Sequence, residues 1–207
     1  MGQPDDAPGF PHAWRAELLS TSPPITPARR FTYPRQIAGE EDALARGALV
    51  VLVHPAAGGS FLATCALGFT DPKMPSGLFS CPNPRELCAV AGGYAYVLDT
   101  ESPECSTHIP LKPVAEVVVL TAQELLLFVG FHEIVAWGTD GLAWQTARLS
   151  WEGIRVTTVR ADANGADALR GFGWNMATDQ EIEFCINLRT GAHTGGGFDR
   201  IYSTANA

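Results

Sequence analysis

Apolar residues along this chain gather in short runs separated by polar turns, and the same order of runs and turns recurs. The segment LCAVAGGYAYVLDT, which starts at Leu87, is followed 38 residues later by LLLFVGFHEIVAWG, which starts at Leu125. In both copies an apolar run reaches a glycine, Gly92 or Gly130, and passes into a second strand-like run before a polar turn. A third, looser copy spans 168–191. Repeats of roughly 40 residues that hold several short strands are typical of β-propeller blades and related stacked sheets.

The runs predict four short strands in each repeat. The predicted strands are 77–81, 86–91, 94–99 and 106–110, then 115–120, 124–130, 132–137 and 142–148, then 154–160, 167–173, 181–188 and 192–195. Residues 125–129 are apolar throughout, as expected of a strand covered on both faces, whereas 142–148 alternates like an outer strand. Frequent short strands bounded by Pro, Gly, Asn and Asp indicate an all-β fold.

Proline sets the first part of the chain apart from the repeats. All fifteen prolines lie at or before Pro113, and seven of them fall within the first 35 residues. Regular helix or a central strand is therefore not expected there, and we predict an irregular Pro-rich arm over residues 1–45. The arm should lie against the β body because it carries Phe10, Trp14, Phe31 and Tyr33. At most one short helix is predicted, near residues 38 to 47.

The remaining chain, 46–207, is predicted to form one β-repeat domain. Its parts are an incomplete blade at 46–70, whose two apolar runs meet at a hairpin over 56–59, and full blades at 77–112, 115–150 and 153–196. Three blades fall short of the roughly four to eight that close into a ring. A further blade is therefore hidden in residues 12–70, or the sheets stack openly, or two chains complete one another.

Two short segments carry a likeness to known proteins. In Val97-Leu98-Asp99-Thr100 and in Asn187-Leu188-Arg189-Thr190-Gly191 a strand-like run ends in a small polar turn. In these segments the repeats resemble β-propeller blades of the WD-repeat and quinoprotein type, over about residues 76–197. The resemblance implies the fold alone and no active site, and the chain as a whole resembles a bacterial protein.

Charge and cysteine content narrow the classes of function. The net charge is −8, and residues 1–75 hold 7 acids and 6 bases, so the remainder carries about −7. Such a surface repels nucleic acid.

No apolar run approaches the roughly 20 residues of a membrane helix and no secretory signal is evident, so a cytoplasmic protein is expected. The five cysteines are odd in number and mostly within apolar runs, which predicts buried, reduced thiols.

Motifs for common catalytic and cofactor sites are not found in the sequence. The five histidines do not form a metal-binding pair, HExxH and CxxC are absent, and no GxSxG elbow marks a nucleophile. The glycines at 58–59 and 195–197 lack the lysine of a phosphate loop. No metal and no cofactor are predicted.

The strongest candidate surface is aromatic and acidic, because four of the five tryptophans fall between Trp137 and Trp174. Tryptophan at blade edges first of all fills the wedge between neighbouring sheets. The functional interpretation is that some of these side chains face a cationic, sugar-like or peptide ligand, with Arg148, Arg155 and Arg170 at the rim. The candidate binding residues are His132, Glu133, Trp137, Trp151, Glu152, Trp174 and Asp179.

Two functions are compatible with these residues. The favoured hypothesis is a non-enzymatic binding or scaffold module whose partner is a small ligand, a protein or a second copy of the chain. The alternative is a small propeller-type hydrolase or lyase that uses His132 and Glu133, or Asp179. Neighbouring residues of a regular strand point to opposite faces, which counts against a joint catalytic role for His132 and Glu133.

Overall fold

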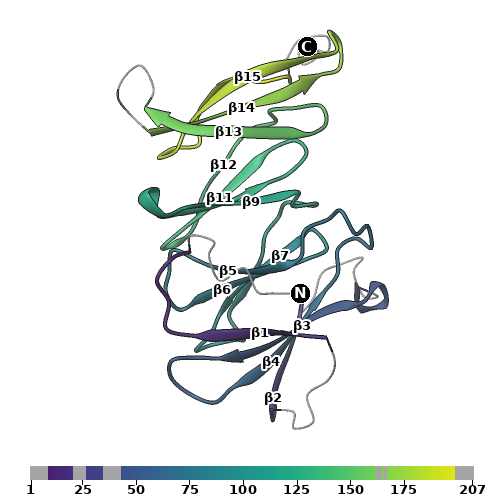
Figure 1. Ribbon diagram of the computed structural model, residues 1–207, viewed down its shortest axis with the longest axis vertical. Coiled ribbons are helices and arrows are strands. Elements are labelled where there is room, and N and C mark those ends of the chain that lie inside the picture. Colours follow the sequence, from purple (N-terminus) through teal and green to yellow (C-terminus); the bar gives the residue numbers. More distant parts are fainter. Residues whose placement is uncertain (1–8, 21–26, 35–42, 162–164, 166, 199–207) are drawn as a thin grey trace, which may run out of the picture.

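The computed structural model describes residues 9–20, 27–34, 43–161, 165 and 167–198. The described regular structure consists of four four-stranded sheets and two short 3-10 helices, η1 (Ala43–Arg46) and η2 (Thr121–Gln123). Figure 1 shows the sheets stacked in chain order along the long axis, from the purple N-terminal sheet to the yellow C-terminal one. The predicted all-β fold of tandem four-stranded blades is confirmed, and the sheets form an open stack.

The three repeats form three meanders in which consecutive strands pair antiparallel. Sheet B holds β5 (Gly77–Ser80), β6 (Glu86–Ala91), β7 (Tyr94–Asp99) and β8 (Ser106–His108). Sheet C holds β9 (Glu116–Leu120), β10 (Leu125–Val129), β11 (Ile134–Gly138) and β12 (Gly141–Gln145). Sheet D holds β13 (Ile154–Ala161), β14 (Asp167–Asn175), β15 (Gln180–Asn187) and β16 (His193–Gly195). Each of the strands predicted in the repeats has its counterpart here.

Sheet A precedes the repeats and differs from the predicted incomplete blade. It holds β1 (Arg15–Leu19), β2 (Arg29–Tyr33), β3 (Ala48–His54) and β4 (Phe61–Ala66), in the order β1-β3-β4-β2. The β3–β4 hairpin is as predicted, but the arm supplies both edge strands, β2 pairing parallel with β4. The expectation of an irregular arm is wrong for these two stretches because its prolines flank them. Residues 1–8, 21–26 and 35–42 lie outside the described part, and so does the first half of the predicted 38–47 helix, whose second half contains the 3-10 helix η1.

Sheets B and C are apolar on both faces because each lies between two other sheets. In sheet B, Leu87 and Ala89 pack in the cluster shared with sheet A, whereas Cys88 and Val90 pack in the cluster shared with sheet C. Every residue of β10 and β11 is buried, whereas most of the edge strand β12 is at least partly exposed. The continuous apolar run at 125–129 is thus a central strand, as predicted.

Gly92 and Gly130 share a repeat position but are required for different reasons. Gly92 has φ +56° in the β6–β7 turn, and a Cβ there would lie 2.4 Å from the Phe69 carbonyl oxygen. Gly130 has no left-handed backbone, but a Cβ there would lie 2.7 Å from Leu111 Cδ1. A residue without Cβ is therefore needed at Gly130 because of side-chain packing and not because of backbone strain.

Gly130→Val is expected to destabilise the protein by about 1 to 3 kcal/mol, because the added atoms overpack the buried Leu111 side chain. Chemical denaturation measures the change. Gly59→Val is the matched control, since no neighbouring atom lies within 4 Å of the added Cβ. A Gly130→Val protein as stable as the Gly59→Val protein would contradict the packing explanation.

The five cysteines are free, and they divide by burial into two groups. Cys65, Cys81 and Cys88 are buried between the sheets, whereas Cys105 is exposed and Cys185 is half-buried. Burial raises the pKa of Cys65 to about 12, and it also raises the pKa of Cys81 and of Cys88. The thiolate that reacts with alkylating reagents is therefore strongly disfavoured at these three positions.

We expect Cys105 to be labelled fast by a thiol reagent in the folded protein and Cys185 more slowly. Cys65, Cys81 and Cys88 should react only after denaturation, because they are inaccessible and protonated. Mass spectrometry of peptides after timed alkylation assigns each rate. Rapid labelling of any of the three buried thiols under native conditions would contradict their placement.

Candidate functional site

The outer face of sheet D, turned away from sheet C, carries aromatic and charged side chains. Strand alternation sets Phe172 and Trp174 on the side opposite Leu169, which packs against sheet C. In register, Glu183 lies beside Phe172 and Glu181 beside Trp174. The residues of this outer face are Arg155, Arg170, Phe172, Trp174, Glu181 and Glu183.

The charges on the outer face of sheet D are paired with one another. Arg155 forms an ion pair with Glu181, and its guanidinium carbon lies 4.5 Å from the centre of the Phe172 ring. The hydrogen bond between them lowers the pKa of Glu181 and raises the pKa of Arg155. Arg170 Nη1 lies 3.1 Å from Glu183 Oε1. These pairs are exposed, so they orient the side chains more than they stabilise the fold.

The β14–β15 hairpin extends this face. Trp174 Nε1 donates a hydrogen bond of 3.0 Å to Asp179 Oδ1, which fixes the indole ring beside the turn. Asn175 Oδ1 accepts from the amides of Ala177 and Thr178 and shapes the same turn. Met176 at the tip is 54% exposed. The predicted residues Trp174 and Asp179 are thus brought together here.

A second group of predicted residues lies where sheets C and D join. The Arg148 guanidinium lies 4.9 Å from the ring centre of Trp151 and 4.8 Å from that of Phe198. Arg148 also donates to the carbonyls of Ser150 and Trp151, each at 3.0 Å, and its Nη2 lies 3.4 Å from His132 Nδ1. His132 and Trp151 therefore take part in holding the joint.

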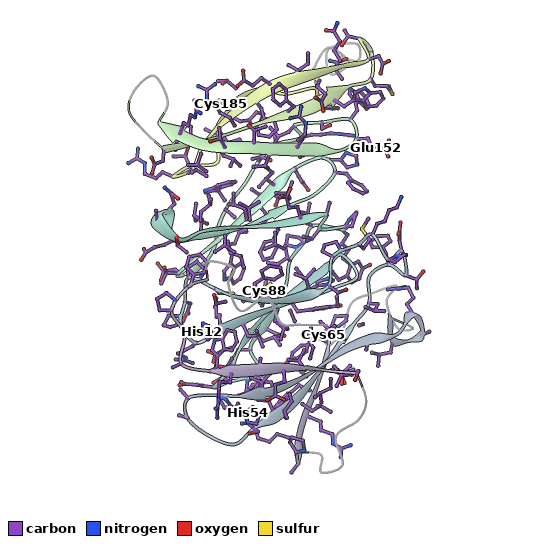
Figure 2. All side chains as sticks on the ribbon, in the orientation of Figure 1. His12, His54, Cys65, Cys88, Glu152 and Cys185 are labelled. Atoms are coloured by element: carbon purple, nitrogen blue, oxygen red, sulfur yellow. The ribbon has the colours of Figure 1, made fainter. Side chains whose placement is uncertain are left out.

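The two predicted glutamates lie beside this joint. Glu152 is exposed at the end of sheet D, as Figure 2 shows. Glu133 is half-buried, and its carbonyl accepts a hydrogen bond from the Gly130 amide. His132 and Glu133 lie in the turn before β11, outside any strand.

Trp137 lies apart from both groups. It is buried between sheets B and C, and its Nε1 donates a 2.7 Å hydrogen bond to Glu86 Oε2. The Glu86 carbonyl also accepts from Trp14 Nε1 at 3.2 Å, so this residue connects sheets B and C with the segment before β1. Burial raises the pKa of Glu86, against the effect of the Trp137 hydrogen bond.

A concave site that sequence analysis missed lies at the other end of the stack. The pocket beside the β3–β4 hairpin has a volume of about 460 Å³, and we call it the His54 pocket. Figure 2 shows His54 in the N-terminal sheet and Cys185 on the C-terminal one. The pocket is lined by Pro27, Ala28, Arg29, Leu52, His54, Gly59 and Ser60. No spacing motif marks these residues, because two distant segments meet only through the β2–β4 pairing.

Within the part of the chain that the structure describes, no three His, Cys, Asp or Glu side chains are grouped as metal ligands would be. No described helix has the length and apolar character needed to cross a membrane. No protein-family model, curated protein or solved structure matches this chain. The candidate sites are therefore interpreted from their own chemistry.

The Glu86–Trp137 contact gives a pH-dependent prediction. Because the folded-state pKa of Glu86 is raised above its ordinary value of 4.5, the native state binds the proton more tightly than the unfolded state does. Stability from this group is present below pH 4.5 and declines as the pH rises through the raised pKa. Glu86→Gln keeps an acceptor for Trp137, so it should remove this decline without loss of stability at neutral pH. Urea denaturation across the pH range measures both effects.

Trp137→Ala tests the packing role of Trp137 in the Glu86–Trp137 contact. The substitution should lower the free energy of unfolding by about 3 to 5 kcal/mol, because it leaves a cavity between sheets B and C. A cost below about 1 kcal/mol would contradict that role. For Glu86→Gln, an unchanged pH dependence would contradict the assignment of the decline to Glu86.

Proposed function

We propose that the protein is a non-enzymatic binding or scaffold module that binds a protein partner through the outer face of sheet D. The supporting observation is an outer sheet face on which Phe172 lies beside Arg155 and Glu183 and Trp174 lies beside Glu181, with Met176 extending from its edge. Aromatic residues, Met and Arg are enriched at protein interfaces, whereas Glu and Lys are depleted there. The proposed surface carries the enriched residue types, and its two glutamates are each paired with an arginine.

The arrangement of the face favours a macromolecule over a small ligand. The side chains stand on a broad sheet face and are held by neighbours, as in the Trp174–Asp179 bond and the Arg155–Phe172 contact. Such rigid aromatic side chains lose little conformational freedom on binding. Glu181 and Glu183 alternate with Arg155 and Arg170, so we propose a partner surface that presents both charge signs around an apolar centre.

The hydrolase or lyase alternative has less support from the geometry. The carboxylate of Asp179 accepts from Trp174, and His132 Nδ1 faces the Arg148 guanidinium. A general acid or base must reach the proton that it transfers, and these contacts direct both groups to structural partners. We also propose a cytoplasmic location, because the five thiols are free.

The proposal predicts that Trp174→Ala strongly weakens partner binding while the fold is kept. Immobilised wild-type and variant proteins are used to capture partners from an extract of the source cells, and partners lost with the variant are identified by mass spectrometry. Each is then purified and titrated against both proteins. We expect binding to the variant to be at least about 30-fold weaker, as for an aromatic interface hot spot of roughly 2 kcal/mol.

The matched control is Thr107→Ala, an exposed change on the edge strand β8 of sheet B, away from the outer face of sheet D. It should leave both capture and affinity unchanged. Light scattering at several concentrations tests a second copy as the partner. A purified partner that binds wild type and Trp174→Ala equally well would overturn the proposed surface.

A further inference from the structure

Strand β9 forms an open edge of sheet C. The strand order of this sheet is β12-β11-β10-β9, so β9 has a neighbouring strand on one side only. Among the described residues, its backbone forms hydrogen bonds with β10 alone, in a register that runs without a break from Glu116 to Leu120. In an antiparallel pair, the N–H and C=O groups of every second residue point away from the neighbouring strand. β9 therefore presents a row of backbone donors and acceptors on its outer side.

The side chains of β9 hold this edge strand between the neighbouring sheets. Val117 and Val119 pack against the cluster between sheets B and C, and Val118 and Leu120 pack against the cluster between sheets C and D. Three consecutive valines also favour the extended backbone. Figure 1 shows sheet C inside the stack, with sheets B and D on its two sides. A further strand would therefore meet a backbone that already has the conformation needed for pairing.

The other described edge strands each carry a feature that discourages pairing with a further strand. β8 and β16 have three residues each, and β12 contains a bulge at Ala143, which has no partner in the register with β11. β1, β2 and β13 contain charged residues inside the strand. β5 has four residues, and the Phe10 amide donates a hydrogen bond to Ser80 at its end. Short strands, charges, bulges and covering segments protect sheet edges, whereas β9 has only one charge, Glu116, at its first residue.

Acidic side chains lie at both ends of the β9 edge. Glu116 begins the strand, Glu124 lies in the turn that follows it, and both are exposed. Neither forms an ion pair with a described residue. A second copy paired antiparallel across a twofold axis at Val118 would bring Glu116 of each chain opposite Leu120 of the other, towards Glu124. Like charges brought together in this way are unfavourable, whereas Lys or Arg at these positions is favourable.

We propose that the β9 edge binds an extended segment of a partner protein, which adds a fifth strand to sheet C. The segment has β-branched apolar residues at its centre, beside the valines of β9, and Lys or Arg at its ends, beside Glu116 and Glu124. Its backbone supplies the hydrogen bonds, as in other cases of strand addition. The β9 edge is separate from the outer face of sheet D, so this inference does not rest on the function proposed above.

The probe is the peptide KVTVTVK with blocked ends, titrated into the isotope-labelled full chain and followed by NMR. The amide shifts of β9 should saturate with a Kd of about 1 mM or tighter. Alternate amides of β9 should exchange rapidly with solvent in the free protein and more slowly with peptide bound. The peptide EVTVTVE should bind about tenfold more weakly at low salt. KVTVTVK with N-methylated central amides should not bind, because it lacks the backbone donors.

Two charge-reversal variants separate the β9 edge from the general charge of the protein. Glu116→Lys should weaken KVTVTVK binding about fivefold at low salt, because it places a cation beside a lysine of the peptide. Glu104→Lys makes the same change in net charge at an exposed residue between β7 and β8, and it should change the Kd by less than about twofold. Thermal denaturation checks that both variants are folded.

Equal binding of KVTVTVK and its N-methylated form would overturn the proposal, as would equal effects of Glu116→Lys and Glu104→Lys. The absence of saturable shifts at about 5 mM peptide would also overturn it. Light scattering tests a second copy as the occupant, and a dimer whose β9 amides are protected without peptide would equally overturn it. None of these results bears on the Trp174 surface, because that surface is tested with a different partner and different variants.

Discussion

Burial of one apolar sheet face against the next is the interaction on which the whole structure depends. Sheets B and C are apolar on both faces, so neither can be stable in water without a neighbour on each side. Each interface also contains a buried aromatic side chain that donates a hydrogen bond across it. Tyr96 donates to Ala66 between sheets A and B, Trp137 to Glu86 between B and C, and Trp144 to Leu188 between C and D. Because hydrogen bonds are directional, these contacts fix how each sheet is placed on the next.

The two ends of the stack differ in the residues that their outer sheet faces present to solvent. Sheet D ends the stack with exposed Arg–Glu pairs, as a terminal repeat requires for solubility. Sheet A keeps half-buried aliphatic residues such as Leu52 on its outer side. The interior sheets have no free face, so the features available for recognition are confined to the ends, the sheet edges and the hairpin loops.

The repeats were readable from the sequence because local patterns determine them. Continuous apolar runs such as 125–129 predict central strands, and turn residues mark their ends, so neighbouring strands follow from the order of the chain. The edge strands of sheet A were missed because Arg29–Tyr33 pairs with a strand roughly 30 residues away, which no local pattern reveals. In β2, Phe31 and Tyr33 alternate with polar residues, and this alternation was the signal in the sequence that could have predicted a strand.

The candidate sites were predictable only in part, for the same reason. The packing expected of tryptophans at blade edges holds for Trp137, which was also a candidate binding residue, whereas the contact between Trp174 and Asp179 emerges only from the fold. The sequence could not show that Arg148 joins His132 to Trp151, or that Arg29 meets Gly59, because these contacts depend on how strands are paired. Residues with ordinary spacing thus become a site only through the fold.

A linear stack also limits how far one site influences another. Each sheet contacts only its neighbours, so a change in sheet D reaches sheet A through two intervening sheets. The hydrogen bonds that involve Glu86 and Tyr96 hold neighbouring sheets together and resist small displacements of one sheet against the next. Coupling between distant sites needs an element with two discrete arrangements. Tightly packed interfaces of this kind favour a single arrangement. The partner surface of sheet D is therefore expected to act independently of changes in the N-terminal sheet A at the other end of the stack.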